Sequence, residues 1–390
     1  MIHKLLHGDL VGITTSKLIA SFGRDLVMVF IPLLLLNNGL KLWQVCGFYV
    51  LYALFKLGVN YPSAKLLNHH GARLGLMIGT SATAGFMTLL TIYISAPSNT
   101  WLLVAMALLM ATQNSFTWNS EHLFISRAMQ MERKSRDLAT IESLKRVVGI
   151  VTPLIGGFIA ALAGQVWLTA IAAVLLFIAL IPIWRIDRMA GGHKKDVALR
   201  YSLRFAPLRD VVANFGFNAH TLVATMVWPI YLAVFVPDFR HIGIIATVAS
   251  LIAVVVLQIA GKRSDGGKTY RVLTEGTTGS SIMHAAWLFA SSNPVTITIL
   301  SALYDIVLGY QFNPWVSLYY AHTRKGGINY IMSMEIAGDL AYLVLWSVLG
   351  IVAYATGDTS FFTIAFGAAA ILAWLCLLMR RETPQTSASG

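Results

Sequence analysis

Apolar blocks long enough to cross a lipid bilayer recur along the whole chain. A helix that spans a bilayer needs roughly 20 predominantly apolar residues, and we place about twelve such blocks in the sequence. They are Ile13–Leu36, Val45–Leu67, Leu74–Ile94, Trp101–Arg127, Ala139–Ala163, Trp167–Ile186, Val211–Val236, Ile242–Ala260, Val272–Ala290, Val295–Ala321, Tyr330–Tyr354 and Phe361–Leu378. The sequence therefore predicts an all-α membrane protein with twelve transmembrane helices.

Composition supports this class and argues against a nucleic-acid partner. Hydrophobic residues make up 57% of the chain and charged residues only 12%, and the mean hydropathy of +0.69 is far from that of a soluble domain. The formal net charge is +12, but the basic residues lie mostly in the even-numbered gaps between blocks, as the positive-inside rule produces. We therefore expect a multi-pass protein of the cytoplasmic (inner) membrane with both termini cytoplasmic.

The chain contains an internal repeat with an offset of about 197 residues. This shift places Pro32 on Pro229 and Trp118 on Trp315, and one register serves the first four blocks of each half. Such a register indicates a duplicated six-helix unit. We expect an N-terminal bundle (residues 1–187), a cytoplasmic linker (188–209) and a C-terminal bundle (210–390), with the two proline and the two tryptophan positions coinciding when the halves are superposed.

The turn between the second and third blocks carries a motif. It reads Ala64-Lys-Leu-Leu-Asn68-His-His-Gly71-Ala-Arg73. On this motif and the repeat, the chain resembles the major facilitator superfamily over essentially its whole length. The family signature at this turn is Gly-x-x-x-Asp-Arg/Lys-x-Gly-x-Arg, so Gly71 and Arg73 are kept, whereas Ala64 and Asn68 replace the first glycine and the aspartate.

The second copy of the motif, in residues 261–268, keeps the opening Gly261 and the aspartate, Asp265. The resemblance implies a fold of two six-helix bundles in which these turns latch the cytoplasmic helix ends together. With Asn68 uncharged, the N-terminal latch would depend on hydrogen bonds rather than on an ion pair.

The fifth block carries the run Thr152-Pro153-Leu-Ile-Gly156-Gly157. It is similar to a Gly-Pro-x-x-Gly-Gly motif of proton-driven exporters in this superfamily. Proline weakens the local hydrogen-bond ladder and small residues let another helix approach, so we expect a bend or a close packing point here. On this feature the sequence favours antiport, and hence export, over symport.

Ionisable side chains inside apolar blocks are expensive in lipid and usually face a cavity or one another. Arg24 and Asp25 lie in the first block about a hundred degrees apart around the helix axis, so we expect them not to share a partner easily. Arg24 turns either toward Asp25, which favours the charged form of that acid, or toward an acid of another helix, such as Glu335 or Asp339. The second interpretation commits Arg24 elsewhere. Asp25 is then the best candidate for a proton-coupling carboxylate, with His122 as the second.

The resemblance implies that helices one, four, seven and ten line a central cavity, and polar residues recur at helical spacing in these blocks. The candidates for substrate binding or coupling are Arg24, Asp25, Asn114, Trp118, Glu121, His122, Asn218, His220, Asp305, Trp315, Glu335 and Asp339. The candidates for gating or structural roles are Asn68, Gly71, Arg73, Glu142, Lys145, Arg146, Pro153, Gly261 and Asp265. Across helices four and five we expect a polar cluster that joins one of Glu121, His122 and Arg127 to one of Glu142, Lys145 and Arg146.

The sequence thus predicts a monomeric, proton-coupled secondary transporter that moves a small solute by alternating access, with no cofactor and no resident metal. Three alternatives stay open: a proton symporter or an uncoupled carrier, a divalent-metal or metal-chelate transporter, and a non-transporting receptor or scaffold on the same fold. Carboxylates and histidines near the midplane would suit a metal. Enzymatic motifs such as the nucleophile elbow or the phosphate loop do not occur, so no enzyme is predicted.

Overall fold

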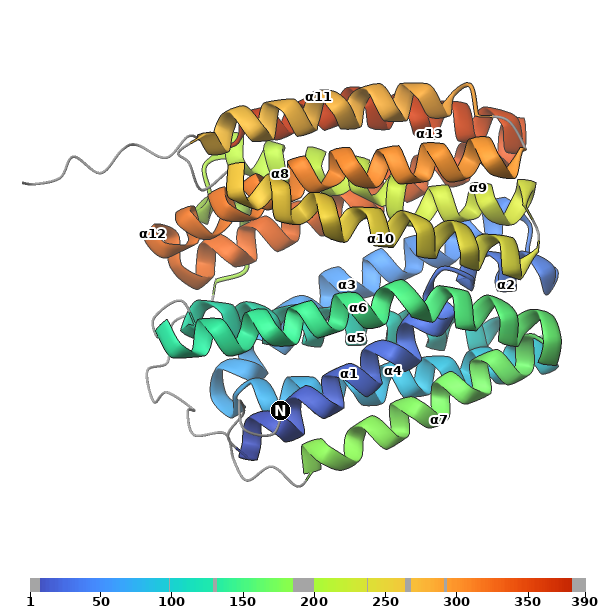
Figure 1. Ribbon diagram of the computed structural model, residues 1–390, viewed down its shortest axis with the longest axis horizontal. Helices are drawn as coiled ribbons and strands as arrows, with labels where there is room; N and C mark the ends of the chain where they lie inside the picture. Colours follow the sequence, from blue (N-terminus) through green and yellow to red (C-terminus); the bar gives the residue numbers. More distant parts are fainter. Residues whose placement is uncertain are drawn as a thin grey trace, which may run out of the picture.

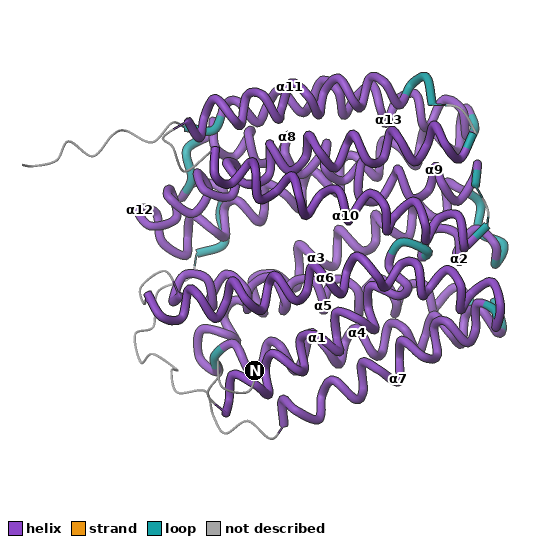
Figure 2. The backbone as a smooth tube through the Cα atoms, in the orientation of Figure 1, coloured by secondary structure: helices purple, strands orange, loops and turns teal. Residues whose placement is uncertain are grey.

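The computed structural model describes residues 8–97, 99–128, 132–184, 200–236, 238–263, 268–290 and 293–380. Within these ranges some side chains, chiefly those of residues 121–143, 145–146 and 253–263, lie outside the description. All regular elements of the described chain are helices (Figure 2). The all-helical prediction is therefore confirmed for the described residues.

The helices form two groups, which we call the first and second halves (Figure 1). The first half comprises α1 (Gly8–Met28), α2 (Ile31–Asn37), α3 (Leu42–His70), α4 (Ala72–Ser95), α5 (Thr100–Ala128), α6 (Glu132–Ala163) and α7 (Gln165–Trp184). The second half comprises η2 (Leu203–Phe205), α8 (Leu208–Leu222), η3 (Val223–Val227), α9 (Trp228–Phe235), α10 (Phe239–Arg263), α11 (Thr269–Trp287), α12 (Pro294–Thr356), α13 (Asp358–Leu372) and η5 (Ala373–Leu378).

Two of the expected blocks are interrupted, and each interruption precedes a proline. The first block bends by 43° between α1 and α2, and Pro32 stands in the first turn of α2. The seventh block passes from α8 through the π-helical turn η3 into α9, whose first turn holds Pro229. Because proline lacks an N–H and its ring clashes with the preceding turn, it is tolerated in the first turn of a helix but disrupts the interior of one. Pro32 and Pro229 are the positions that the repeat offset relates.

The tenth and eleventh blocks run together as α12. Gly327 interrupts this element with φ 64° and ψ −160°, a backbone conformation that favours glycine. The two parts, Pro294–Thr323 and Gly326–Thr356, are each long and apolar enough to span a membrane. Seven described helices pass this test, or eight when α1 and α2 are counted as one bent span. The protein is thus a multi-pass membrane protein.

Two long seams lie between the described helices of the halves, and α2 also contacts α9. The second part of α12 runs beside α3, and α10 runs beside α6. We call the end of the bundle where α7 ends and α8 begins the linker face, and the other end the opposite face. Near the opposite face Tyr49 stacks on Trp346 with ring centroids 4.6 Å apart, and Phe30 lies 5.5 Å from Phe239. Apolar packing therefore continues across both seams.

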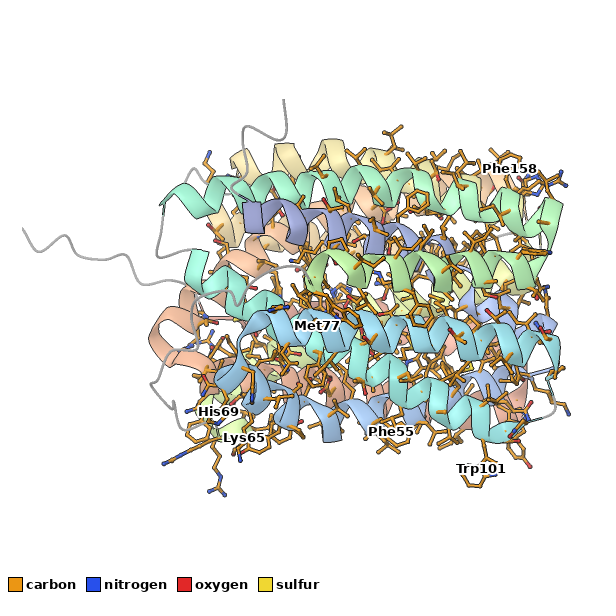
Figure 3. The ribbon with its side chains drawn as sticks, turned by 90° about the horizontal axis from the view of Figure 1, so that it is seen from below. Phe55, Lys65, His69, Met77, Trp101 and Phe158 are labelled. Atoms are coloured by element: carbon orange, nitrogen blue, oxygen red, sulfur yellow. The ribbon has the colours of Figure 1, made fainter. Side chains whose placement is uncertain are left out.

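Large apolar side chains also cover the outside of the bundle. Trp101 is 79% exposed and Phe158 is 42% exposed, and both lie at the rim of the molecule in Figure 3. A soluble protein rarely presents so much large apolar surface, whereas a surface that contacts lipid tails does. The outer surface thus agrees with the membrane assignment.

Glycines bring α6 and α10 into backbone contact at the opposite face. A Cβ atom on Gly243 would lie 2.5 Å from the carbonyl oxygen of Pro153, and Gly157 packs equally closely against the backbone of Phe239. The expected close packing point at Pro153 is therefore present, and its partner is a helix of the other half. Such contacts are typical of helix pairs that lack bulky side chains at the crossing.

We expect Gly243→Ala to separate the halves at the opposite face. Overpacking costs about 1–3 kcal/mol, which shifts a two-state equilibrium roughly 5–150-fold. Cys46 of α3, fully buried beside Gly350 of α12, should then react faster with a membrane-impermeant maleimide added from that face. The variant Gly367→Ala is the matched control, because nothing lies within 4 Å of its added Cβ. An unchanged rate at Cys46 in Gly243→Ala would contradict the expectation.

Candidate functional site

A buried ion pair joins the two halves in the middle of the seam between α3 and α12. Lys56 Nζ lies 2.7 Å from Asp339 Oδ1, and the two side chains are 10% and 0% exposed. Of the ion pairs that the structure describes, this one alone connects the first half with the second. Because removing two charges from water is costly, a pair in this position requires close geometry and further hydrogen bonds.

Amide and hydroxyl groups supply those hydrogen bonds. Asn60, one turn along α3 from Lys56, donates to Asp339 Oδ2. Asn119 of α5 donates to Ser63 Oγ at 2.7 Å and to the Asn60 carbonyl at 3.4 Å. The network therefore ties three helices, α3, α5 and α12, to one carboxylate.

Aromatic rings and a second acid complete the surroundings of Lys56. The Tyr342 ring lies with its centroid 5.6 Å from Lys56 Nζ, at the distance of a cation–π contact. Glu335, one turn before Asp339 on α12, also acts electrostatically on Lys56. Tyr52 packs edge-on against Tyr342 with centroids 6.4 Å apart. Aromatic groups thus enclose the pair on the side of the opposite face.

The segment before α8 crosses the same seam nearer the linker face. The Tyr201 hydroxyl donates to the Leu57 carbonyl of α3 at 2.9 Å, and Ser333 Oγ of α12 donates to the Ser202 carbonyl at 2.6 Å. The Arg200 N–H donates to Asn329 Oδ1 at 2.9 Å. These residues therefore connect the two helices that the ion pair connects.

Of the two alternatives for Arg24, the structure shows the pairing with Asp25. Arg24 Nε donates to Asp25 Oδ1 at 2.8 Å, so these neighbours pair with each other across their angular separation. The long guanidinium side chain reaches back to the short acid, whereas the acids proposed for Arg24, Glu335 and Asp339, lie near Lys56 on the other seam. Asp25 Oδ2 points toward Gly149 of α6, 3.9 Å from its ideal Cβ position.

Asp305 is the candidate acid for which the described residues provide no hydrogen-bond or ion-pair partner. It lies in the span Pro294–Thr323 and is half-buried. In the described part of the chain its carboxylate makes no hydrogen bond and no ion pair. Charge that is neither paired nor solvated is unfavourable in a membrane helix, and proton binding removes it.

His220, one of the candidates for substrate binding or coupling, has no exposed surface. It is fully buried inside the second half, where its Nδ1 lies 3.4 Å from His284 Nε2 of α11. Another candidate on α8, Asn218, lies against Gly338 of α12. The two repeat-related tryptophans also differ: Trp118 is 43% exposed, whereas Trp315 is 3% exposed and stacks on Phe217.

Asn114, on α5, is half-buried, and its side-chain oxygen has no hydrogen-bond partner among the described residues.

The turn between α3 and α4 contacts α7 of its own half. Gly71 ends α3 with φ +81°, and Arg73 donates to the carbonyls of Ile183 at 3.2 Å and Trp184 at 3.1 Å. Asn68 makes no hydrogen bond within the described residues.

The remaining candidates lie outside the described side chains. These are Glu121, His122, Arg127, Glu142, Lys145, Arg146, Gly261 and Asp265. The polar cluster between helices four and five therefore stays a prediction. Among the described residues no three His, Cys, Asp or Glu side chains gather as metal ligands.

Lys56 is the site residue that the sequence reasoning missed. It is the one charged residue in the middle of the second block, 11 positions after Val45, whereas Lys65 lies near the end of that block. A lone lysine at that depth signals a buried partner by the same argument that singled out Arg24. Nothing in the local sequence names Asp339, 283 residues later, as that partner.

Comparisons with known proteins agree with this architecture. Membrane-length helices with ionisable groups paired between them define a multi-pass membrane protein. Residues 13–214, more than half of the chain, match the family described as Major Facilitator Superfamily. The chain belongs to the major facilitator superfamily of secondary transporters.

Solved structures show the same fold over almost the whole chain. A crystal structure of a mutant of nucleoside transporter NupG matches with a TM-score of 0.72 at 11% identity, covering 96% of this chain and 100% of that one. A D-xylose-proton symporter matches with a TM-score of 0.72 at 11% identity, covering 97% and 98%. No curated protein sequence matches the chain.

Proposed function

We propose that the protein is a proton-coupled secondary active transporter that moves a small solute across the cytoplasmic membrane by alternating access. In this proposal α1 with α2, and α8 with η3 and α9, each make one crossing, α12 makes two, and α13 with η5 makes one. The chain then has twelve crossings in two six-helix bundles, residues 1–187 and 210–390. The linker face and both termini are cytoplasmic, and the protein works as a monomer.

The observation that carries the proposal is the Lys56–Asp339 pair between the halves. A solute can leave toward the linker face only if the seam between α3 and α12 opens there. Separating the charges is then the principal electrostatic cost of opening, whereas apolar and backbone contacts join the described residues of the halves near the opposite face. A coupling ion can shift the equilibrium between the open and closed states of such a seam.

Asp305 supplies the proton site in this proposal. It is an acid in a membrane span that pairs with no described residue, so its charge changes on proton binding without a competing cation in the described part of the chain. One of the structural neighbours is titled a D-xylose-proton symporter, which supports coupling to protons. Asp25 is a weaker candidate because Arg24 already balances its charge.

Proteoliposomes that enclose a pH-sensitive dye test the proposal. Solutes from a panel of nucleosides, pentoses and small carboxylates are added outside, and the pH of the lumen is followed. Acidification of the lumen with solute entry indicates symport, and alkalinisation indicates the antiport that the fifth-helix motif favours. If every solute gives the trace of empty liposomes, the receptor or scaffold alternative replaces transport.

A further inference from the structure

The outward face of α3 changes in character toward the linker face. Leu54 is 48% exposed, and Lys65 and His69, about three and four turns farther along the same side of the helix, are exposed as well. In Figure 3 Phe55, Lys65 and His69 follow one edge of the bundle. Helices of membrane proteins pass from apolar to cationic side chains where they leave the hydrocarbon core. This end of α3 therefore lies at the level of the lipid headgroups.

The segment that precedes α8 lies against this end of α3. The Tyr201 hydroxyl donates to the Leu57 carbonyl at 2.9 Å, and the ring centroids of Tyr201 and Tyr61 lie 5.8 Å apart. Ser333 Oγ of α12 holds the same segment from the second half, through the Ser202 carbonyl at 2.6 Å. Tyrosines are enriched where the hydrocarbon core of a bilayer meets its headgroups. The two tyrosines therefore mark that level beside the seam between α3 and α12.

Three exposed cations lie around the two tyrosines. Lys65 follows Tyr61 by about one helical turn, and Arg200 and Arg204 precede and follow Tyr201 in the chain. All three cationic side chains are exposed. We call Lys65, Arg200 and Arg204 the basic strip. It joins the end of a first-half helix to the segment that α12 of the second half holds.

No acidic residue balances the basic strip. Residues 54–73 and 200–209 contain no aspartate and no glutamate. The ion pairs that the structure describes include no residue of the strip. The next acid in the chain, Asp210, is fully buried, and its carboxylate pairs with Arg380 at 2.9 Å. Positive charges at the headgroup level attract anionic lipids, so the strip is complementary to an anionic headgroup.

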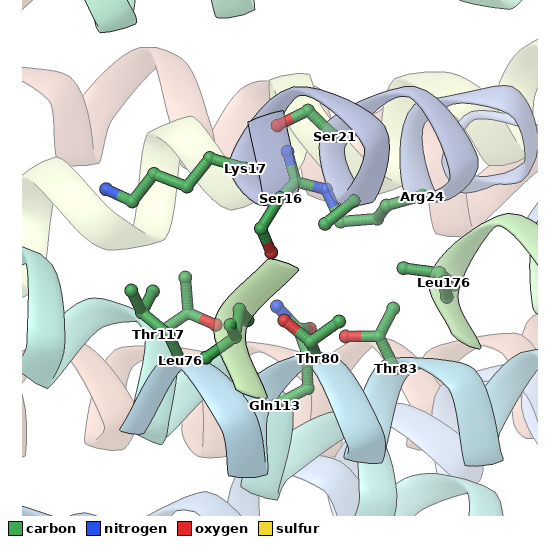
Figure 4. A pocket seen from close by; sticks show the side chains of 12 residues that line it. Ser16, Lys17, Ser21, Arg24, Leu76, Thr80, Thr83, Gln113, Thr117 and Leu176 are labelled. Carbon is green, nitrogen blue, oxygen red and sulfur yellow. The ribbon is translucent and has the colours of Figure 1, made fainter. Parts of the chain in front are cut away.

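Cations also line a small recess inside the first half, but it does not fit a lipid headgroup. The recess lies among α1, α4, α5 and α7, and its volume is about 50 Å³ (Figure 4). One water needs about 10–15 Å³ of such volume, so only a few waters fit. Arg24, on the wall of the recess, is already paired with Asp25. The basic strip is exposed instead, so a lipid can reach it from the bilayer.

We propose that the basic strip binds the headgroup of an anionic phospholipid at the seam between α3 and α12. The phosphate oxygens accept hydrogen bonds from Arg200 and Arg204, because a guanidinium group matches a phosphate in geometry. Lys65 adds a third positive charge. The acyl chains lie along the apolar part of the same α3 face, which includes Leu54. Such lipid binding requires no transport, so it is independent of the proposed function.

Competition between two lipids tests the proposal. The purified full-length protein in a neutral detergent is mixed with equal amounts of dioleoyl phosphatidylglycerol and dioleoyl phosphatidylcholine, and native mass spectrometry counts the lipids that stay bound. We expect the protein to retain phosphatidylglycerol in preference to phosphatidylcholine. The preference should fall as ionic strength rises, because salt screens exposed charges. Equal retention of the two lipids would overturn the proposal.

Substitutions in the strip locate the lipid. Lys65→Gln and Arg204→Gln should each weaken phosphatidylglycerol binding about fivefold, the equivalent of about 1 kcal/mol for each cation, and the double variant roughly 25-fold. Lys268→Gln is the matched control, because Lys268 is an exposed cation just before α11, which lies away from α3 in Figure 1. If Lys268→Gln lowers retention as much as Lys65→Gln does, the lipid responds only to net charge and the proposal is wrong.

Thermal unfolding in the same detergent gives a second readout. Phosphatidylglycerol should raise the midpoint of unfolding saturably, because a ligand that binds only the folded state stabilises it. The double variant Lys65→Gln/Arg204→Gln should lose this rise, and an equal rise in that variant would contradict binding at the strip. Inorganic phosphate at the same concentration should not displace the lipid. If it does, the strip binds a free phosphate and the lipid assignment is wrong.

Discussion

Lys56→Met destabilises the closed seam between α3 and α12 by about 3–5 kcal/mol, because it leaves the Asp339 carboxylate buried and unpaired. Asp339 is fully buried, and Lys56 is its partner at 2.7 Å. The hydrogen bond from Asn60 remains, but an amide does not neutralise the charge. The expected result is a lower midpoint of thermal unfolding and a linker face that opens more often.

The double variant Lys56→Met/Asp339→Leu should recover most of the lost stability. Replacing both partners of a buried pair by apolar residues of similar volume is often neutral, whereas removing one partner is not. A double-mutant cycle on unfolding midpoints therefore isolates the pair. If the double variant is as unstable as the sum of the two single variants, Lys56 and Asp339 do not act together and do not form a gate between the halves.

Asp305→Asn abolishes solute accumulation driven by a pH gradient and preserves solute exchange at equal pH. A gradient of one pH unit corresponds to about 1.36 kcal/mol for each proton, so one-proton coupling sustains roughly tenfold accumulation. Without a titratable group at residue 305, the ratio of the solute concentrations on the two sides of the membrane should fall to about one. The shape of the site is retained because asparagine is nearly isosteric with aspartate.

Two variants make this result specific. Asp238→Asn is the matched control, because Asp238 lies outside the spans and receives a hydrogen bond from Arg240, which lowers the pKa of Asp238. The substitution Asp238→Asn should leave solute accumulation unchanged. Asp25→Asn tests the assignment made from the sequence alone. If Asp25→Asn loses accumulation while Asp305→Asn keeps it, the proton site is on α1.

Much of the fold was predictable because its causes are local. Runs of apolar residues define the spans. Pro32 and Pro229 lie in the first turns of α2 and α9, and the repeat offset places one on the other. Close approach at Pro153 followed from small residues at helical spacing, although the partner helix did not.

The site was less predictable because its pairings are not local. The sequence left open whether Arg24 turns toward Asp25 or toward an acid of another helix, and the structure shows the bond to Asp25. His220 is a candidate in the seventh block, and its contact with His284 of another helix has no signal in the local sequence. Lys56 and Asp339 meet only because α3 and α12 lie side by side. Only the packing of whole helices decides such contacts.

Alternating access predicts that the distances between the two halves change in opposite senses at the linker face and the opposite face. Spin labels are attached to cysteines at Lys65 and Leu208 on the linker face, or at Lys41 and Thr356 on the opposite face, in a chain whose Cys46 and Cys376 are replaced by serine. Distances in liposomes are then compared at low and high pH. We expect two populations on each face that change reciprocally with pH, the linker-face distance lengthening as the opposite-face distance shortens, and no pH dependence in Asp305→Asn. A single distance on both faces at every pH would contradict alternating access controlled by proton binding.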